Sequence, residues 1–267
     1  DRHVPWIHNI RNTDNIICID DNDPMRLLRL FNEEAGKKYL REEAKLDSQF
    51  VDNLSLFGIS GIANVLACIK MAKYLGDALG YESAFGPAVT WGLGTYGNGF
   101  ISKYPIKEIE VYPIPDPEEK NEDAYYETRV VLHTVVDMGG RDVDFFVTHF
   151  GLARAEAQNA ADTLVWLIKT AKNPVVVMGD FNLPANDPIL APIFELLQDT
   201  FEVYPDKTVY TYPSHPCITQ KPEHYNKIDY IFVSRHFKVE SVEIPALLLS
   251  DHKPYIAYLD LMDEAKG

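Results

Sequence analysis

Paired cysteines, long apolar runs and an excess of positive charge are all missing from this sequence. Its three cysteines, Cys18, Cys68 and Cys217, lie far apart without the spacing of a metal site, and an odd number cannot form a complete set of internal disulfides. No apolar run is long enough to span a bilayer, and no basic segment followed by an apolar one marks a signal peptide. We therefore expect free thiols and a soluble protein. Because the chain begins at Asp1 and not at Met, its compartment stays open between the cytoplasm and secretion after removal of a signal segment.

Positive charge is scarce, since 25 Lys and Arg stand against 40 Asp and Glu and leave a net charge of −15. Proteins that bind long nucleic acids attract the phosphate backbone with positive charge, so a long duplex is a disfavoured partner. A hydrophobic content of 46% in 267 residues is enough to fill one large core. Because neither a repeat nor a low-complexity linker divides the chain, we expect a single domain over residues 1–267. The oligomeric state stays open.

Apolar runs of strand length recur along the chain, and several are apolar on both faces, as in the central strands of a covered sheet. Apolar residues at helical spacing lie within 65–79 and 164–171, and the Pro- and acid-rich segment 112–126 is typical of a loop. Strands interleaved with helices predict an α/β domain. The predicted strands are TRVVLHTVV (128–136), DVDFFVTHF (142–150), NPVVVMGDF (173–181), KIDYIFVS (227–234) and PYIAYLDL (254–261).

Polar residues follow two of these strands. If VVVMGDFNLP stays extended, Asp180 and Asn182 face one side and Phe181 the other, so a carboxylate and an amide line one rim. The alternative is an Asx turn before Pro184, a common way to leave a strand. In VDFFVTHF, alternation places His149 at the end of an apolar face, where a lone histidine is more often structural than catalytic.

The two remaining polar positions predict a pair. In NKIDYIFVS, Asp229 shares a face with Ile231 and Val233, an unfavourable position for a carboxylate unless a cation or a donor meets it. His252 in SDHKP is the natural candidate, because an Asp that holds one ring nitrogen sets the tautomer and favours the imidazolium form. The alternative for SDHKP is a polar turn between two strands. Together, the polar residues at these strand ends predict one shared site.

Five ordered motifs resemble the endonuclease/exonuclease/phosphatase superfamily of metal-dependent phosphoesterases. They are GNGFISKYPI (97–106), VTHFGL (147–152), VVVMGDFN (175–182), KIDYIFVS (227–234) and SDHKP (250–254). The resemblance covers residues 81–261. It implies the DNase I-like fold, an α/β four-layer sandwich in which two mixed β-sheets pack face to face with helices on the outside.

The resemblance also implies a role for each polar residue at the rim. His252 would contact the phosphate at the reaction centre, and Asp229 would orient its imidazole. Asp180 would orient or deprotonate the attacking water. Asn182 and His149 would hold the phosphoryl oxygens.

A metal site for magnesium, with manganese as the alternative cation, follows from the same resemblance. Asp251 would face the cation and Asn9 in VPWIHNIRN would support it, while Asp20 in CIDDND is a second candidate for the place of Asn9. Arg129 in YYETRVV stands where relatives carry an arginine, and its guanidinium would clamp a phosphate. The alternative for Arg129 is a surface pair with Glu127.

The sequence departs from the family at NLSLFGIS, where relatives carry the glutamate that is the principal metal ligand. Gly58 stands in its place, and no carboxylate occurs between Leu54 and Lys70. Three explanations stay open. Asp251, Asn9 and waters hold the cation alone, another acid reaches it, or the protein is a weakened or inactive relative.

We therefore predict a metal-dependent hydrolase, a phosphodiesterase or phosphatase acting on a small or lipid-derived phosphate ester. A nuclease of the same superfamily is the alternative enzyme, although the acidic segment DPEEKNED (116–123) beside a rim loop would repel a phosphate backbone. A noncatalytic binding relative is the alternative outside the enzymes, and Gly58 is its main support.

Overall fold

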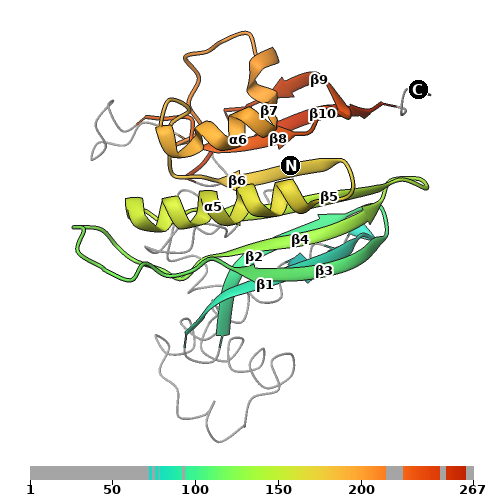
Figure 1. Ribbon diagram of the computed structural model, residues 1–267. Helices are drawn as coiled ribbons and strands as arrows, with labels where there is room; N and C mark the ends of the chain where they lie inside the picture. The colour runs from blue at the N-terminus through green and yellow to red at the C-terminus, as the bar shows by residue number, and fades with distance from the viewer. Residues whose placement is uncertain are drawn as a thin grey trace, which may run out of the picture.

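A six-stranded mixed sheet forms the centre of the fold, with its strands in the order β3-β4-β5-β6-β8-β7 (Figure 1). The computed structural model describes residues 72–73, 76–77, 79–91, 94–214, 225–246 and 251–262. Neighbouring strands are antiparallel except for β5 and β6, which are parallel. The strands are β3 (Ile106–Pro113), β4 (Val130–Asp137), β5 (Asp142–His149), β6 (Val175–Asp180), β7 (Gln198–Asp199) and β8 (Asp229–Val233).

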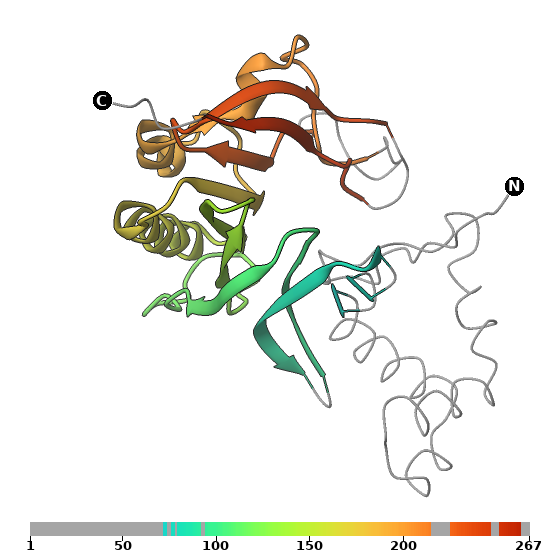
Figure 2. The same cartoon turned by 90° about the vertical axis from the view of Figure 1, so that its right-hand side faces the viewer.

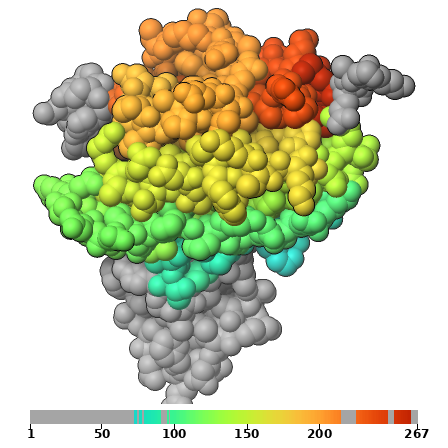
Figure 3. Space-filling view, in the orientation of Figure 1, coloured from blue at the N-terminus to red at the C-terminus, as the bar shows by residue number. Residues whose placement is uncertain are grey.

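Helices cover one face of this sheet and form the outer surface on that side (Figure 3). Helix α5 (Arg154–Thr170) is the crossover that the parallel pair β5 and β6 needs. It buries residues at helical spacing, among them Ala157, Ala160, Ala161, Leu164 and Leu167, against Phe146 and Phe232 of the sheet. Helix α6 (Ala191–Leu196) adds Ile193 to the same core, and the short 3-10 helix η1 (Pro188–Leu190) adds Ile189 and Leu190. The 3-10 helix η2 (Thr200–Val203) packs through Phe201 with β9 and β10 instead.

Two antiparallel strand pairs pack on the opposite face of the sheet. The first pair, β1 (Glu82–Trp91) and β2 (Gly94–Ser102), contacts β4 through Ala84 and Phe100. The second pair, β9 (Phe237–Glu243) and β10 (Ile256–Leu261), covers Val143 and Val176. Figure 2 shows the helices and the β1–β2 pair on opposite sides of the six-stranded sheet.

The predicted α/β class with outer helices is confirmed. Of the two mixed sheets predicted for the four-layer sandwich, the six-stranded sheet is mixed, and the layer that faces it consists, within the described residues, of two antiparallel strand pairs. All five predicted strands are present as β4, β5, β6, β8 and β10, and α5 covers the predicted helical face at 164–171. The helical pattern at 65–79 lies largely outside the described residues. The single domain over residues 1–267 stays a prediction for the same reason. Among the described helices, none combines the length and apolar character needed to cross a membrane.

Candidate active site

Three neighbouring strands end in polar residues at one edge of the central sheet. The strand register pairs His149 of β5 with Asp180 of β6, and Asp180 with Asp229 of β8. Alternation turns all three side chains to the face that carries the strand pairs, because Val147, Met178 and Ile231 two residues away pack in that layer. The topology therefore gathers two carboxylates and an imidazole that are far apart in sequence.

The chain around Asp180 adopts a conformation that brings β6 close to β5. Gly179 has a φ of +152°, and a β-carbon there would lie 1.8 Å from the carbonyl oxygen of Thr148, so only glycine fits. The sequence analysis assumed that the chain stays extended from Asp180 to Asn182. The structure corrects this, because the chain turns after Asp180. Asn182 has a φ of 51° and donates its backbone N–H to Asp180 Oδ1 at 2.8 Å, an Asx turn.

The Asx turn and the functional placement of Asn182 occur together. Its side-chain nitrogen Nδ2 lies 3.1 Å from Nε2 of His149 and donates to the carbonyl oxygen of Phe150 at 2.9 Å. The turn therefore directs the amide back over the end of β5. The two sequence alternatives for this motif do not exclude one another.

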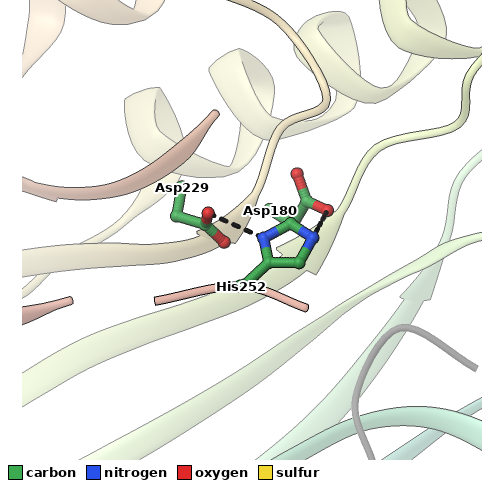
Figure 4. Close-up of side chains that lie close together, drawn as sticks. All are labelled: Asp180, Asp229 and His252. Atoms are coloured by element: carbon green, nitrogen blue, oxygen red, sulfur yellow. Dashed lines mark hydrogen bonds and ion pairs between the residues drawn. The ribbon is translucent and has the colours of Figure 1, made fainter. Parts of the chain in front are cut away.

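His252 lies between two carboxylates (Figure 4). Its Nδ1 is 2.8 Å from Asp229 Oδ2, and its Nε2 is 3.7 Å from Asp180 Oδ2. Burial opposes the charged form, but the hydrogen bond to Asp229 and the charges of Asp229 and Asp180 outweigh it and raise the pKa of His252 to about 10. The imidazole is therefore an imidazolium at neutral pH. The ring of Tyr212 packs beside it, with centroids 4.9 Å apart.

Backbone hydrogen bonds with the segment 211–214 fix the position of the SDHKP motif. Lys253 donates its N–H to the carbonyl oxygen of Thr211 at 2.8 Å, and Ser214 donates to that of Asp251 at 2.5 Å. The buried Thr211 hydroxyl in turn accepts from the N–H of Asp229 at 3.2 Å. Thr211 and Tyr212 were not predicted from the sequence, and no motif spacing could have indicated them.

A second buried chain of contacts approaches His149 from the start of β4. Arg129 places NH1 2.9 Å from His149 Nδ1 and NH2 2.8 Å from Glu127 Oε2, and the Arg129 and Glu127 side chains are only 8% and 7% exposed. Of the two sequence alternatives for Arg129, the pair with Glu127 is present, but it is buried and not at the surface. Burial, followed by the positive charges of Arg129 and His252, lowers the pKa of His149 well below its usual value. His149 is therefore neutral.

The carboxylates of the site suit a hard divalent cation, whereas the imidazolium of His252 has no lone pair to offer one. Ligand atoms of Asp180, Asp229 and His252 lie within 4.8 Å of one another, and Asp251 is close enough to raise the pKa of His252. Three carboxylates against one imidazolium leave two negative charges, which would repel an anionic substrate unless a cation offsets them. Because His252 Nδ1 is hydrogen-bonded to Asp229, we assign that nitrogen to the hydrogen bond and not to a metal. The predicted ligand Asn9, the alternative Asp20 and Gly58 all lie outside the described residues.

A mixed sheet faced by further strands, with acids, imidazoles and an amide at one edge, agrees with the architecture that the sequence motifs imply. The family model of the endonuclease/exonuclease/phosphatase family matches residues 41–252, and the chain belongs to this family. Members of the family are generally hydrolases, among them phosphatases and nucleases.

Several proteins resemble the chain over most of their length. The uncharacterized protein YbhP of Escherichia coli K12 is 26% identical over 199 residues, which are 71% of this chain and 72% of YbhP. The crystal structure of a family member from Bacteroides vulgatus has a TM-score of 0.58 and 24% identity, and the match covers 71% of this chain and 80% of that one.

Two other solved structures share the fold. The mannosyl-6-phosphatase Bt3783 of Bacteroides thetaiotaomicron has a TM-score of 0.57 and 19% identity, covering 72% of this chain and 82% of that one. TDP2 of D. rerio, complexed with a single-strand DNA product, has a TM-score of 0.53 and 17% identity, and the match covers 70% of this chain and 80% of that one. At these identities the likeness establishes the fold alone.

Proposed function

We propose that the protein hydrolyses a small or lipid-derived phosphate ester with the help of a divalent cation, magnesium or manganese. The observation that carries this proposal is the position of His252, a charged imidazole held 2.8 Å from Asp229 and 3.7 Å from Asp180. A fixed positive charge at this edge suits the negative charge that grows on a phosphoryl group during hydrolysis. Family membership supports the reaction class.

Each residue of the site has a role in this proposal. Asp180 orients or deprotonates the attacking water. Its Oδ1 accepts the hydrogen bond of the Asx turn, so its Oδ2, which faces both imidazoles, is the oxygen that would contact the water. Water attacks phosphorus, the ester bond breaks, and the leaving alcohol takes up a proton. His252 contacts the phosphate, whereas His149 and Asn182 hold phosphoryl oxygens. No covalent intermediate with the protein is needed.

The cation would be held by Asp251 with Asn9, and the absence of a carboxylate at Gly58 would weaken its binding. When bound, magnesium supplies positive charge next to the phosphoryl and leaving oxygens. Asp229 is not assigned to the cation, because it orients His252.

Charge supports a small substrate. The net charge of −15 and the exposed acids of segment 116–123 disfavour a long polyanion. The phosphatase Bt3783 shares the fold and its name describes a sugar phosphate substrate, which makes phosphomonoesters of small molecules the first class to assay. A nuclease is the second candidate, since TDP2 with a DNA product shares the fold as well.

The experiment is a substrate panel assayed with magnesium, with manganese and with a chelator. The panel contains a sugar phosphate, an aryl phosphate, an aryl phosphodiester, a lipid phosphodiester and single-stranded DNA. His252→Ala is the inactive variant, and His236→Ala is its matched control, because the His236 ring contacts Ser234 outside the site at 3.0 Å. Cation-dependent turnover that is lost only in His252→Ala supports the proposal. A folded wild type that turns over no member of the panel contradicts it and supports a noncatalytic relative.

A further inference from the structure

Asn98 of β2 connects the layer of strand pairs to the central sheet through two directional hydrogen bonds. The residue is buried, and its Nδ2 donates to the carbonyl oxygen of Val130 at 2.9 Å and to that of Val147 at 3.1 Å. An amide nitrogen carries two hydrogens, so it can make both bonds at once. Because both partners are acceptors, they also fix which way the amide is turned.

The two carbonyl groups lie next to strand ends that carry residues of the site. Val130 directly follows Arg129 at the start of β4, and Val147 lies just before the last residues of β5, which ends at His149. The side chains of Arg129 and His149 meet there, with NH1 2.9 Å from Nδ1. Asn98 therefore binds both strands beside the place where their side chains make contact.

The pair β1–β2 lies close enough to β4 for so short a side chain to reach it. Asn98 pairs with Gly86 in the strand register, and a β-carbon at Gly86 would lie 3.0 Å from that of Leu132. Nearby, Ala84 and Phe100 pack on Leu132 through apolar contacts, which have no preferred direction. A hydrogen bond requires a defined distance and angle. The amide of Asn98 therefore determines how the two strand ends lie relative to β2.

We propose that Asn98 is a positioning residue of the site, which holds the ends of β4 and β5 so that Arg129 and His149 stay in contact. The inference rests on the proposed function in one respect, since His149 is the residue that would hold a phosphoryl oxygen. Asn182 binds the chain on the other side of His149, because its Nδ2 donates to the carbonyl oxygen of Phe150 at 2.9 Å. Two amides thus restrict the backbone that carries this imidazole, as precise placement of a functional side chain requires.

The first test does not depend on activity. Crystal structures of the metal-free wild type, Asn98→Ala and Phe100→Leu are compared. Phe100→Leu is the matched control, since it weakens the same layer from the same strand and leaves the amide in place. In Asn98→Ala we expect the distance from Arg129 NH1 to His149 Nδ1 to exceed about 3.5 Å, beyond a hydrogen bond. In the wild type and in Phe100→Leu it should stay near 2.9 Å.

The inference is overturned if Asn98→Ala retains the contact, or if Phe100→Leu loses it as well. Should Asn98→Ala fail to fold, Asn98→Ser takes its place with the same expectation. A hydroxyl has one hydrogen and can serve only one of the two carbonyl groups, so the second strand end is released.

Kinetics on the best substrate of the panel then show whether Asn98 acts through His149. We expect Asn98→Ala to lose about 10- to 100-fold in kcat/KM, as for other residues that support a functional side chain, while thermal unfolding shows it folded at the assay temperature. Combined with His149→Ala, it should add no more than about a threefold loss to that of His149→Ala alone, because nothing is left to position. Losses that multiply would give Asn98 an effect of its own and overturn the inference.

Failure of the proposed function gives a different result. No member of the panel is then turned over, while the crystal structures still show whether Asn98 keeps Arg129 and His149 in contact. Failure of the inference alone leaves the wild type active and the contact intact in Asn98→Ala. The two failures are therefore distinguishable.

Discussion

Asp229 accepts a 2.8 Å hydrogen bond from Nδ1 of His252, although 23 residues separate the two in sequence. The strand β8 supplies the carboxylate, and the SDHKP segment reaches it because Thr211 and Ser214 bind the backbone of Lys253 and Asp251. Within this pair the imidazolium of His252 carries a localized positive charge in an otherwise acidic protein. Most of the expected chemistry depends on this charge.

His252→Ala should abolish phosphoesterase activity, with a loss of roughly 100-fold or more in kcat/KM and little change in fold. The imidazole lies at the sheet edge, and the backbone bonds that hold its segment do not use its side chain. Steady-state kinetics and thermal unfolding, with His236→Ala as the matched control, measure both effects. A folded His252→Ala protein with near-wild-type kcat/KM would refute the assignment.

Asp180→Asn should lower kcat by roughly 100-fold or more, because an amide cannot take a proton from water. The fold should persist, since the amide oxygen can still accept the N–H of Asn182, now 2.8 Å from Asp180 Oδ1, and so keep the Asx turn. Kinetics on the best substrate of the panel decide this. A loss below about threefold would leave Asp180 with the turn alone.

The raised pKa of His252 predicts a pH-dependent contribution to stability. Because the folded pKa of about 10 exceeds the unfolded value of 6.5, the contribution is fully present below about pH 6.5 and is lost as pH rises through about 10. Asp229→Asn should lower the pKa of His252 and reduce this contribution. Urea unfolding of both metal-free proteins near pH 6 and near pH 10 measures it. Equal destabilisation by Asp229→Asn at both pH values would contradict the linkage.

Gly179→Ala should destabilise the protein by roughly 2–4 kcal/mol, since it combines backbone strain with a clash against the Thr148 carbonyl oxygen, 1.8 Å from the new β-carbon. Gly139→Ala is the control. Gly139 also has a positive φ, +74°, but nothing lies within 4 Å of its β-carbon, so about 1 kcal/mol is expected. Denaturant unfolding compares the two. Equal losses would mean that the close approach of β6 to β5 contributes nothing.

The fold was predictable where burial leaves a simple pattern. Strands β5, β6 and β8 are apolar runs bounded by polar residues, and each was found from the sequence. The pair β1–β2 was missed because Gly and Pro residues within it lower β propensity, and its pairing depends on packing against Leu132 of β4. A local pattern cannot contain that tertiary contact.

The site was predictable in part for the same reason. Alternation placed His149 and Asp229 on apolar faces, and the unfavourable burial of Asp229 indicated His252 as its partner, which lies 2.8 Å away. The burial of Arg129 was not predictable, because it depends on how the segment before β4 passes the end of β5. The catalytic roles of these residues stay predictions.

Gly58 stands where a carboxylate ligand for the cation is expected. Because affinity for a hard cation depends on the number of carboxylates and on site rigidity, the wild type should need a high magnesium concentration. Gly58→Glu should lower the concentration for half-maximal activity, provided that the backbone at Gly58 is one that other residues adopt. Asp251→Asn should raise it, and its backbone carbonyl would still accept the N–H of Ser214.

Calorimetric and activity titrations of the three proteins with magnesium decide the matter, with Gly139→Ala as a control away from the motifs of the site. Opposite shifts in Gly58→Glu and Asp251→Asn would place both positions at one cation. Tight wild-type binding that Gly58→Glu does not improve would show that another acid already fills the place of the glutamate. An Asp251→Asn protein with wild-type magnesium dependence would remove Asp251 from the metal site, because the loss of a carboxylate ligand must weaken the binding of a hard cation.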